Sequence, residues 1–222
     1  MAVTVVIPTL NEEDWIAGSV TSAFAAGAAE VIVVDGGSVD RTPRLAKGAG
    51  ARLLLSVPMR ARQLNLGADA ASHETLVFLH ADSRLPAGAA GVIEDALMQG
   101  ADFGGFRIAF AEPSRRLRLA AAMINLRTSV TRCPWGDQAQ FIRRETFLKA
   151  GGYPEMPLME DYELARRMKR RGRSVLLPMT VTTSGRRFLR KGVLRTAAHN
   201  WRTIIRYRMG ADIDALARSY RR

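Results

Sequence analysis

The run Val31-Ile32-Val33-Val34-Asp35-Gly36-Gly37-Ser38-Val39-Asp40-Arg41-Thr42 joins an apolar strand to an acidic, glycine-rich loop. Three more short apolar runs, at residues 4–7, 52–55 and 76–79, alternate with segments of helical periodicity. Strands that are apolar on both faces and alternate with helices are typical of βαβ units around a parallel sheet. The sequence therefore predicts an α/β fold in which helices flank a mainly parallel central sheet.

The rest of the chain extends this pattern. Asn11 is expected to cap the first helix, and the glycine-rich stretch 102–108 is typical of a strand with a bulge or a bend. Helices are expected over residues 115–130 and 162–171. Because we find no internal repeat and no linker, we predict one domain over residues 1–222 that ends in a helical extension at 191–222.

Polar loops follow three of the four early strands. Pro8-Thr9-Leu10-Asn11-Glu12-Glu13 follows the first, residues 35–42 follow the second, and His80-Ala81-Asp82-Ser83 follows the fourth. Ligands of open parallel sheets bind beyond the carboxyl ends of the strands, so the three loops together indicate a site, although each alone also fits an ordinary turn. A nucleoside diphosphate needs a carboxylate for its base, backbone donors, and a metal held by an acid. Asp35, Glu12 and Asp82 are placed for those roles.

Other features exclude several classes of protein. No G-x-G-x-x-G follows a strand and no G-K-[ST] loop occurs, which argues against a dinucleotide oxidoreductase and a P-loop NTPase. The single cysteine, Cys133, cannot form an internal disulfide or a cysteine-based zinc cluster. No signal-type leader and no apolar run of about 18 residues is found. We therefore expect a cytoplasmic protein, with attachment to the inner face of the membrane as an open alternative.

Positive charge is concentrated at the C-terminal end of the chain. Residues 1–161 hold 16 Lys and Arg against 18 Asp and Glu, whereas residues 162–222 hold 17 against 3. The amphipathic segment 189–209 mixes these cations with apolar side chains. Such a segment is either a helix that lies on an anionic membrane surface or one that packs its apolar side on the domain.

Seven motifs, taken together and in order, resemble the family 2 glycosyltransferases with a GT-A fold over about residues 3–190. They are Pro8-Thr9-Leu10-Asn11-Glu12, the segment 33–42, Arg62-Gln63-Leu64-Asn65-Leu66-Gly67-Ala68, Phe78-Leu79-His80-Ala81-Asp82, Gly136-Asp137-Gln138-Ala139-Gln140-Phe141, Gly151-Gly152-Tyr153 and Met159-Glu160-Asp161-Tyr162-Glu163-Leu164. The short length, His80-Ala81-Asp82 and Ser184-Gly185-Arg186-Arg187-Phe188 look most like the compact bacterial subgroup of radical-SAM/selenodomain-associated, or arsenosugar-type, transferases.

The resemblance implies an inverting, metal-dependent transfer from a nucleoside-diphosphate sugar, with UDP favoured over GDP. Residues 1–110 would bind the donor and residues 111–190 would hold the acceptor and the catalytic groups. Asp35 would contact the base and Arg62 the phosphates, while Asp82 would be the last acid of the family's metal motif and bind Mg²⁺ or Mn²⁺. The donor-binding residues implied by the match are Pro8, Thr9, Asn11, Glu12, Asp35, Gly37, Arg62 and Asp82. His80 replaces the motif's first acid, and it either ligates Mn²⁺ or only packs.

Asp161 matches the family's general base, which takes the proton of the attacking hydroxyl. The resemblance places Asp137, Gln138 and Glu160 near the donor sugar or the acceptor. Arg186 and Arg187 stand where processive relatives carry Gln-x-x-Arg-Trp, and either could contact the diphosphate. The loss of the Gln and the Trp favours a single transfer to a small or lipid-linked acceptor over polymer synthesis.

Two other functions compete with this interpretation. The chain could be an inactive module that binds nucleotide sugars, a reading that the replacement of the first metal acid by His80 weakly favours. It could also be a nucleic-acid-binding protein that uses its basic segment. No helix-turn-helix, zinc finger or RNP-type strand supports the second alternative, so no nucleic-acid partner is expected.

Overall fold

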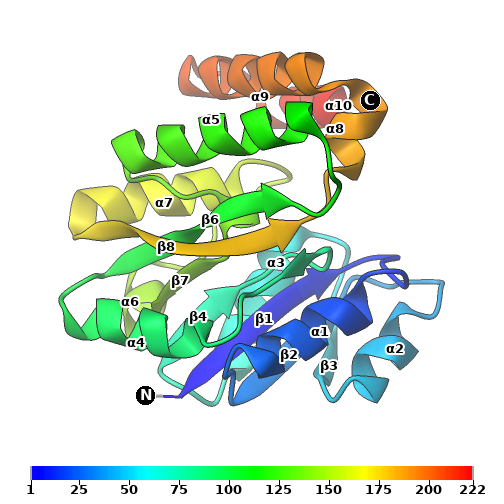
Figure 1. Cartoon of the computed structure of the whole chain (residues 1–222), viewed down its shortest axis with the longest axis vertical. Helices are drawn as coiled ribbons and strands as arrows, with labels where there is room; N and C mark the ends of the chain where they lie inside the picture. Colours follow the sequence, from blue (N-terminus) through cyan, green and yellow to red (C-terminus); the bar gives the residue numbers. More distant parts are fainter. Residues whose placement is uncertain (1, 222) are drawn as a thin grey trace.

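An eight-stranded sheet with the order β3-β2-β1-β4-β7-β6-β8-β5 runs through the computed structural model, which describes residues 2–221 (Figure 1). The strands are β1 Val3–Thr9, β2 Glu30–Asp35, β3 Arg52–Leu55, β4 Thr75–Phe78, β5 Ser83–Arg84, β6 Phe103–Phe110, β7 Gln140–Arg143 and β8 Ser174–Thr183. The first four pair in parallel, β6 pairs in parallel with β8, and β7 lies antiparallel between β4 and β6. The four predicted apolar runs are all strands, as expected.

Successive residues of the central strands point into two separate cores. Val5 and Ile7 of β1 pack with helices α1 Ile16–Ala25, α2 Thr42–Gly48 and α4 Ala89–Met98. Val6 points to the other face, toward α3 Arg60–Ala70, α6 Arg144–Lys149 and α7 Glu160–Arg171. Helix α3 lies so close to β1 that a Cβ on Gly67 would stand 2.3 Å from Val6 Cγ1. Both faces of the sheet are therefore covered, which explains why its strands are apolar throughout.

The strand predicted to be irregular carries a register shift. β6 changes its pairing with β8 between Phe106 and Arg107, which confirms the expected bulge. The glycine just before it lets the chain approach closely, because a Cβ on Gly105 would lie 2.6 Å from Pro134. Helix α5, Arg115–Thr131, then packs on β6, and a short 3-10 helix η1 at Gly136–Gln138 precedes β7.

Three helices follow β8: α8 Arg186–Lys191, α9 Val193–Arg208 and α10 Ile213–Arg221. The last two lie within residues 191–222, where we expect a helical extension, and α8 precedes it. Figure 1 shows α9 lying across α5 at the end of the molecule that is remote from α1 and α2. The inner face of α9 buries Thr203 and Ile204, as the packing alternative predicted. Its outer face exposes Leu194 and Ile205 among arginines, so membrane contact stays a prediction. No helix within residues 2–221 is long and apolar enough to span a bilayer.

Candidate active site

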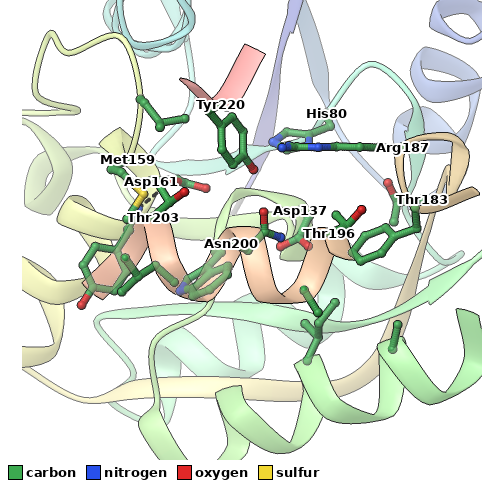
Figure 2. A pocket seen from close by; sticks show the side chains of 18 of the residues that line it. His80, Asp137, Met159, Asp161, Thr183, Arg187, Thr196, Asn200, Thr203 and Tyr220 are labelled. Carbon is green, nitrogen blue, oxygen red and sulfur yellow. Dashed lines mark hydrogen bonds between the residues drawn. The ribbon is translucent and has the colours of Figure 1, made fainter. Parts of the chain in front are cut away.

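Two cavities meet beyond the carboxyl ends of β1 and β4. The sheet-end cavity, of about 330 Å³, is lined by the loop after β1 and the start of α3. The helical cavity, of about 510 Å³, lies beneath α5, α9 and α10 and is drawn in Figure 2. Arg60, His80 and Asp82 line both, so a molecule in one cavity can reach a molecule in the other.

Two carboxylates of the sheet-end cavity face a single cation. One terminal nitrogen of Arg186, Nη2, donates to Glu12 Oε1 and lies 3.3 Å from Asp82 Oδ2. The second oxygen of Glu12, Oε2, is buried without a hydrogen-bond partner. Burial raises the pKa of Asp82, and Arg186 only partly offsets that effect. Since carboxylate oxygens are the ligands that Mg²⁺ and Mn²⁺ prefer, Glu12 and Asp82 fit part of the coordination sphere of such an ion.

Asp161 lies at the start of α7, where the helix N-terminus favours negative charge. Its Oδ2 accepts a hydrogen bond from Gly136 N at 2.8 Å, and its Oδ1 accepts one from Tyr162 N at 2.7 Å. Burial opposes ionisation of the Asp161 carboxyl, but Arg60, 3.6 Å away, and the two backbone donors together lower its pKa. Asp161 is therefore a carboxylate at neutral pH and can accept a proton.

Arg60 organises the junction between the cavities. Its Nε donates to Glu160, whose side chain is only 2% exposed. Its Nη1 donates to His80 Nε2 at 3.3 Å, because an arginine has no acceptor to offer. Burial and the charge of Arg60 lower the pKa of His80 to about 4, so the ring is neutral near pH 7. Metal ligation by His80 stays a prediction, and the nitrogen concerned already accepts from Arg60.

Asp137, on η1, faces the helical cavity with one unsatisfied oxygen. Its Oδ1 is buried without a hydrogen-bond partner. Burial raises the pKa of Asp137, and the positive charge of Arg127 offsets only part of that rise. This carboxyl group therefore has an oxygen that can accept a hydrogen bond from a ligand in the cavity.

Ten of the residues predicted from the sequence line the two cavities. His80 and Asp82 line both; Pro8, Thr9, Glu12 and Arg186 line the sheet-end cavity, and Asp137, Glu160, Asp161 and Arg187 line the helical cavity. The side chains of Arg186 and Arg187, the first two residues of α8, point in different directions. Arg186 points to Glu12 and Asp82, whereas the guanidinium carbon of Arg187 lies 3.8 Å from the ring centroid of Tyr220.

Three predicted donor residues make contacts within or between the strand-end loops and line neither cavity. The carboxylate of Asp35 accepts hydrogen bonds from Gly37 N at 3.0 Å, from Ser38 N at 2.9 Å and from Ser38 Oγ, so it shapes the turn. Gly37 takes a φ of 92° in that turn. Asn11 does not cap a helix, because α1 begins at Ile16; its Oδ1 accepts from Val39 N and ties the two loops together.

Two other predicted site residues, Arg62 and Gln138, line neither cavity in this structure. Arg62 lines neither cavity, because it points to the surface and its Nε donates to Glu155 at 2.8 Å. Arg60, two residues earlier on α3, occupies the position that we expected for Arg62. Gln138 is fully buried and its side chain hydrogen-bonds within the protein. For example, its Nε2 donates to the carbonyl oxygen of Phe106 at 3.0 Å.

Sequence reasoning missed several residues that line the helical cavity. They are Arg60, Arg127, Thr196, Asn200 and Tyr220. The last three belong to the C-terminal helices, where periodicity predicts a helix but does not predict what that helix covers. For Arg60, its place at the first position of α3, beside the strand ends, was a usable signal.

Comparisons with known proteins agree with this architecture. Residues 4–197 match the model of the family described as Glycosyl transferase family 2. No match is found among curated proteins. TarS of S. aureus superposes with a TM-score of 0.65 at 16% identity, over 83% of this chain but only 37% of TarS. A structure of TarS residues 1–349 in complex with UDP-GlcNAc gives a TM-score of 0.61 at 15% identity, over 83% of this chain and 58% of that one.

Glucosyl-3-phosphoglycerate synthase from Mycobacterium tuberculosis, in complex with Mn²⁺ and UDP-glucose, gives a TM-score of 0.56 at 21% identity. That superposition covers 82% of this chain and 70% of the synthase. At such identities the structural likeness establishes the fold, which is GT-A. The family model spans most of the chain, and its match includes the strand-end loops, the junction at Arg60 and the start of α7. The chain belongs to glycosyl transferase family 2.

Proposed function

We propose that this enzyme transfers a sugar from a nucleoside-diphosphate sugar, preferentially a UDP-sugar, to a hydroxyl or similar nucleophile of an acceptor, with inversion at the anomeric carbon. The observation that carries the proposal is the meeting of two cavities at Arg60, His80 and Asp82, with Asp161 on one side of the junction. We assign the donor to the sheet-end cavity and the acceptor to the helical cavity.

Several features support a nucleotide sugar in the sheet-end cavity. The cavity lies beyond the ends of parallel strands, where nucleotides bind in α/β proteins. Arg60 and Arg186 line this cavity, and each guanidinium group can donate hydrogen bonds to two oxygens of a diphosphate. The solved structures of TarS and of the mycobacterial synthase contain UDP-GlcNAc and UDP-glucose, which favours UDP for this chain.

A divalent cation, Mg²⁺ or Mn²⁺, would be held by Asp82 and Glu12 together with oxygens of the diphosphate. When bound, such an ion neutralises negative charge on a departing nucleoside diphosphate. The unpartnered Glu12 Oε2 and the burial of Asp82 are the features of this chain that fit it. The Mn²⁺ and Mg²⁺ complexes of the mycobacterial synthase support the same assignment.

The chemical step needs a base on the acceptor side. As the acceptor oxygen bonds to the anomeric carbon, the bond from that carbon to the diphosphate oxygen breaks, and attack from the opposite face inverts the configuration. The hydroxyl proton passes to the Asp161 carboxylate, which Arg60 and two backbone N–H groups keep ionised. A positioned base of this kind contributes roughly 10²- to 10⁴-fold to a rate.

Thermal unfolding with UDP and with GDP, each with and without Mn²⁺, tests the donor assignment. A ligand present at about 100 times its Kd should stabilise the fold by roughly 2.7 kcal/mol. We expect this stabilisation with UDP and Mn²⁺, and its loss in Asp82→Asn. Asp69→Asn, an exposed change on α3 outside both cavities, is the matched control. No stabilisation of the wild type by either nucleotide with Mn²⁺ would refute the proposal.

An inactive nucleotide-sugar-binding module would pass that test, so a second measurement is needed. Release of UDP from UDP-sugars, with water as the acceptor, reports the chemical step directly. The proposal requires a slow release of UDP that Asp161→Asn reduces roughly 10²- to 10⁴-fold. Binding without release, for every UDP-sugar and acceptor tested, would favour the module. The finer resemblance to the compact bacterial subgroup, and the cytoplasmic location, stay predictions.

A further inference from the structure

We propose that the acceptor of this enzyme is an amphiphile, with a hydroxyl-bearing head at the junction and an apolar body held between α5 and α9. This inference rests on the proposed function, because it assumes that the helical cavity receives the acceptor. The wall of the helical cavity is apolar on one side and carries polar atoms without hydrogen-bond partners on the other, so it suits a molecule with an apolar body and a polar head.

The apolar side of the wall comes from helices and strand ends that face one another across the cavity. Its side chains are Phe110 of β6, Met123 and Ile124 of α5, Phe188 of α8, and Trp201 and Ile204 of α9. Met123 and Trp201 are 44% and 54% exposed, so the apolar lining continues to the surface. A purely polar acceptor would leave this surface in contact with water, whereas an alkyl or aromatic body would cover it.

The polar side of the wall carries three buried oxygens without hydrogen-bond partners. They are Asp137 Oδ1, Thr196 Oγ1 and Asn200 Oδ1. Figure 2 shows these three side chains gathered in one part of the cavity, with Asp161 beyond them. Because buried polar atoms are normally satisfied, such a cluster indicates a ligand that supplies the missing bonds.

The chemistry of the unsatisfied atoms selects hydroxyl groups. A carboxylate oxygen and an amide oxygen can only accept, so the ligand must donate to Asp137 and Asn200. Arg127 Nε, which lines the same cavity, is a buried donor without a partner, so the ligand must also accept. A hydroxyl group does both, whereas a carboxylate or phosphate cannot donate to Asp137.

Part of this wall lies beyond the segment that matches the family. The family match ends at residue 197, but Asn200, Trp201, Ile204 and Tyr220 all line the cavity. The extension therefore provides contacts that the matched segment lacks. We infer that α9 selects the acceptor by its apolar body.

Two neighbouring alanines on α9 allow a matched test. Ala197 lines the cavity, whereas Ala198 is exposed on the outer side of the helix. Isothermal titration of the UDP–Mn²⁺-saturated protein compares octyl β-glucoside, below its critical micelle concentration, with methyl β-glucoside, which has the same head and no tail. We expect octyl β-glucoside to bind at least tenfold more tightly. Ala197→Trp should weaken its binding at least tenfold, and Ala198→Trp should not.

A second variant tests the polar side without filling the cavity. Thr196→Val replaces the unpartnered hydroxyl of a side chain that is 2% exposed with a methyl group of similar size. We expect it to weaken both glucosides several-fold while the urea midpoint of the free protein stays unchanged or rises. This variant keeps the inference testable if Ala197→Trp does not fold.

Equal affinity for the two glucosides would overturn the inference, and so would octyl β-glucoside binding that a folded Ala197→Trp leaves intact. The proposed function fails separately, through absence of UDP binding by the wild type with Mn²⁺. If octyl β-glucoside binds but UDP does not, the helical cavity is an amphiphile site without the transferase role. If UDP binds but neither glucoside does, the donor assignment stands and the acceptor class is refuted.

Discussion

Replacement of Arg60 by leucine should destabilise the fold through the acid that it leaves behind. Glu160 is only 2% exposed, and Arg60 is the cation that hydrogen-bonds to it. Asp161, 3.6 Å from Arg60, loses the same neighbour. In Arg60→Leu, therefore, a buried carboxylate is left without its cation, which is more costly than the loss of an exposed ion pair.

The magnitude follows from burial of the two partners. Breaking a fully buried pair by removing one member costs about 3–5 kcal/mol. Arg60 is itself 39% exposed, so water can reach the site and we take the lower end, about 3 kcal/mol. Leucine and arginine have similar helix propensities, so the change of residue type in α3 adds little.

Arg62→Leu is the matched control, two residues further along α3. Arg62 pairs with Glu155, but their side chains are 48% and 54% exposed, so its loss should cost only about 0–1 kcal/mol. Urea unfolding measures both variants, and a double variant, Arg60→Leu with Glu160→Leu, should recover much of the lost stability. If Arg60→Leu destabilises no more than Arg62→Leu, the pairing at the junction does not stabilise the fold and this reasoning is refuted.

Two further predictions concern the acids of the helical cavity. Asp161→Asn should slow UDP release from a UDP-sugar roughly 10²- to 10⁴-fold at unchanged UDP affinity; a rate within tenfold of wild type would exclude Asp161 as the base. Asp137→Asn should raise stability at pH 7 by about 1 kcal/mol or more, because it removes a buried charge with an unpartnered oxygen. Burial raises the pKa of Asp137 in the folded state, so wild-type stability falls as pH rises through that pKa, and the gain in the variant should vanish below about pH 3.9 in urea titrations.

The fold class could be predicted because a short local sequence pattern marks each of its early strands. Short apolar runs at 4–7, 31–34, 52–55 and 76–79 are all strands, and the irregular glycine-rich stretch is the bulged strand β6. Each of these features depends on neighbours in sequence. The antiparallel insertion of β7 between β4 and β6 depends on contacts between distant segments, and no local pattern predicted it.

Site residues that follow a strand could be predicted from the sequence. Site residues that lie on a helix distant in sequence could not. Asp82 and Glu12 stand beyond β4 and β1, and both line the sheet-end cavity as the topology requires. Thr196 and Asn200 reach the helical cavity only because α9 lies across α5. A basic amphipathic sequence specifies that one face of α9 is covered, but it does not specify that the cover leaves a cavity.

Asp35 and Asp82 show how position alone misleads. Asp35 is the last residue of the parallel strand β2 and Asp82 follows the parallel strand β4, yet Asp35 uses both oxygens in the turn after it, whereas Asp82 faces a cavity. The difference lies in the next residues, because Gly36-Gly37-Ser38 can fold back and present two N–H groups and a hydroxyl to the acid, as an Asx turn does. An acid at a strand end is therefore a better candidate ligand when the residues after it cannot close such a turn. By this criterion Asp82 should bind the donor's cation, and Asp35 should set the shape of the loop that Asn11 ties to the first strand.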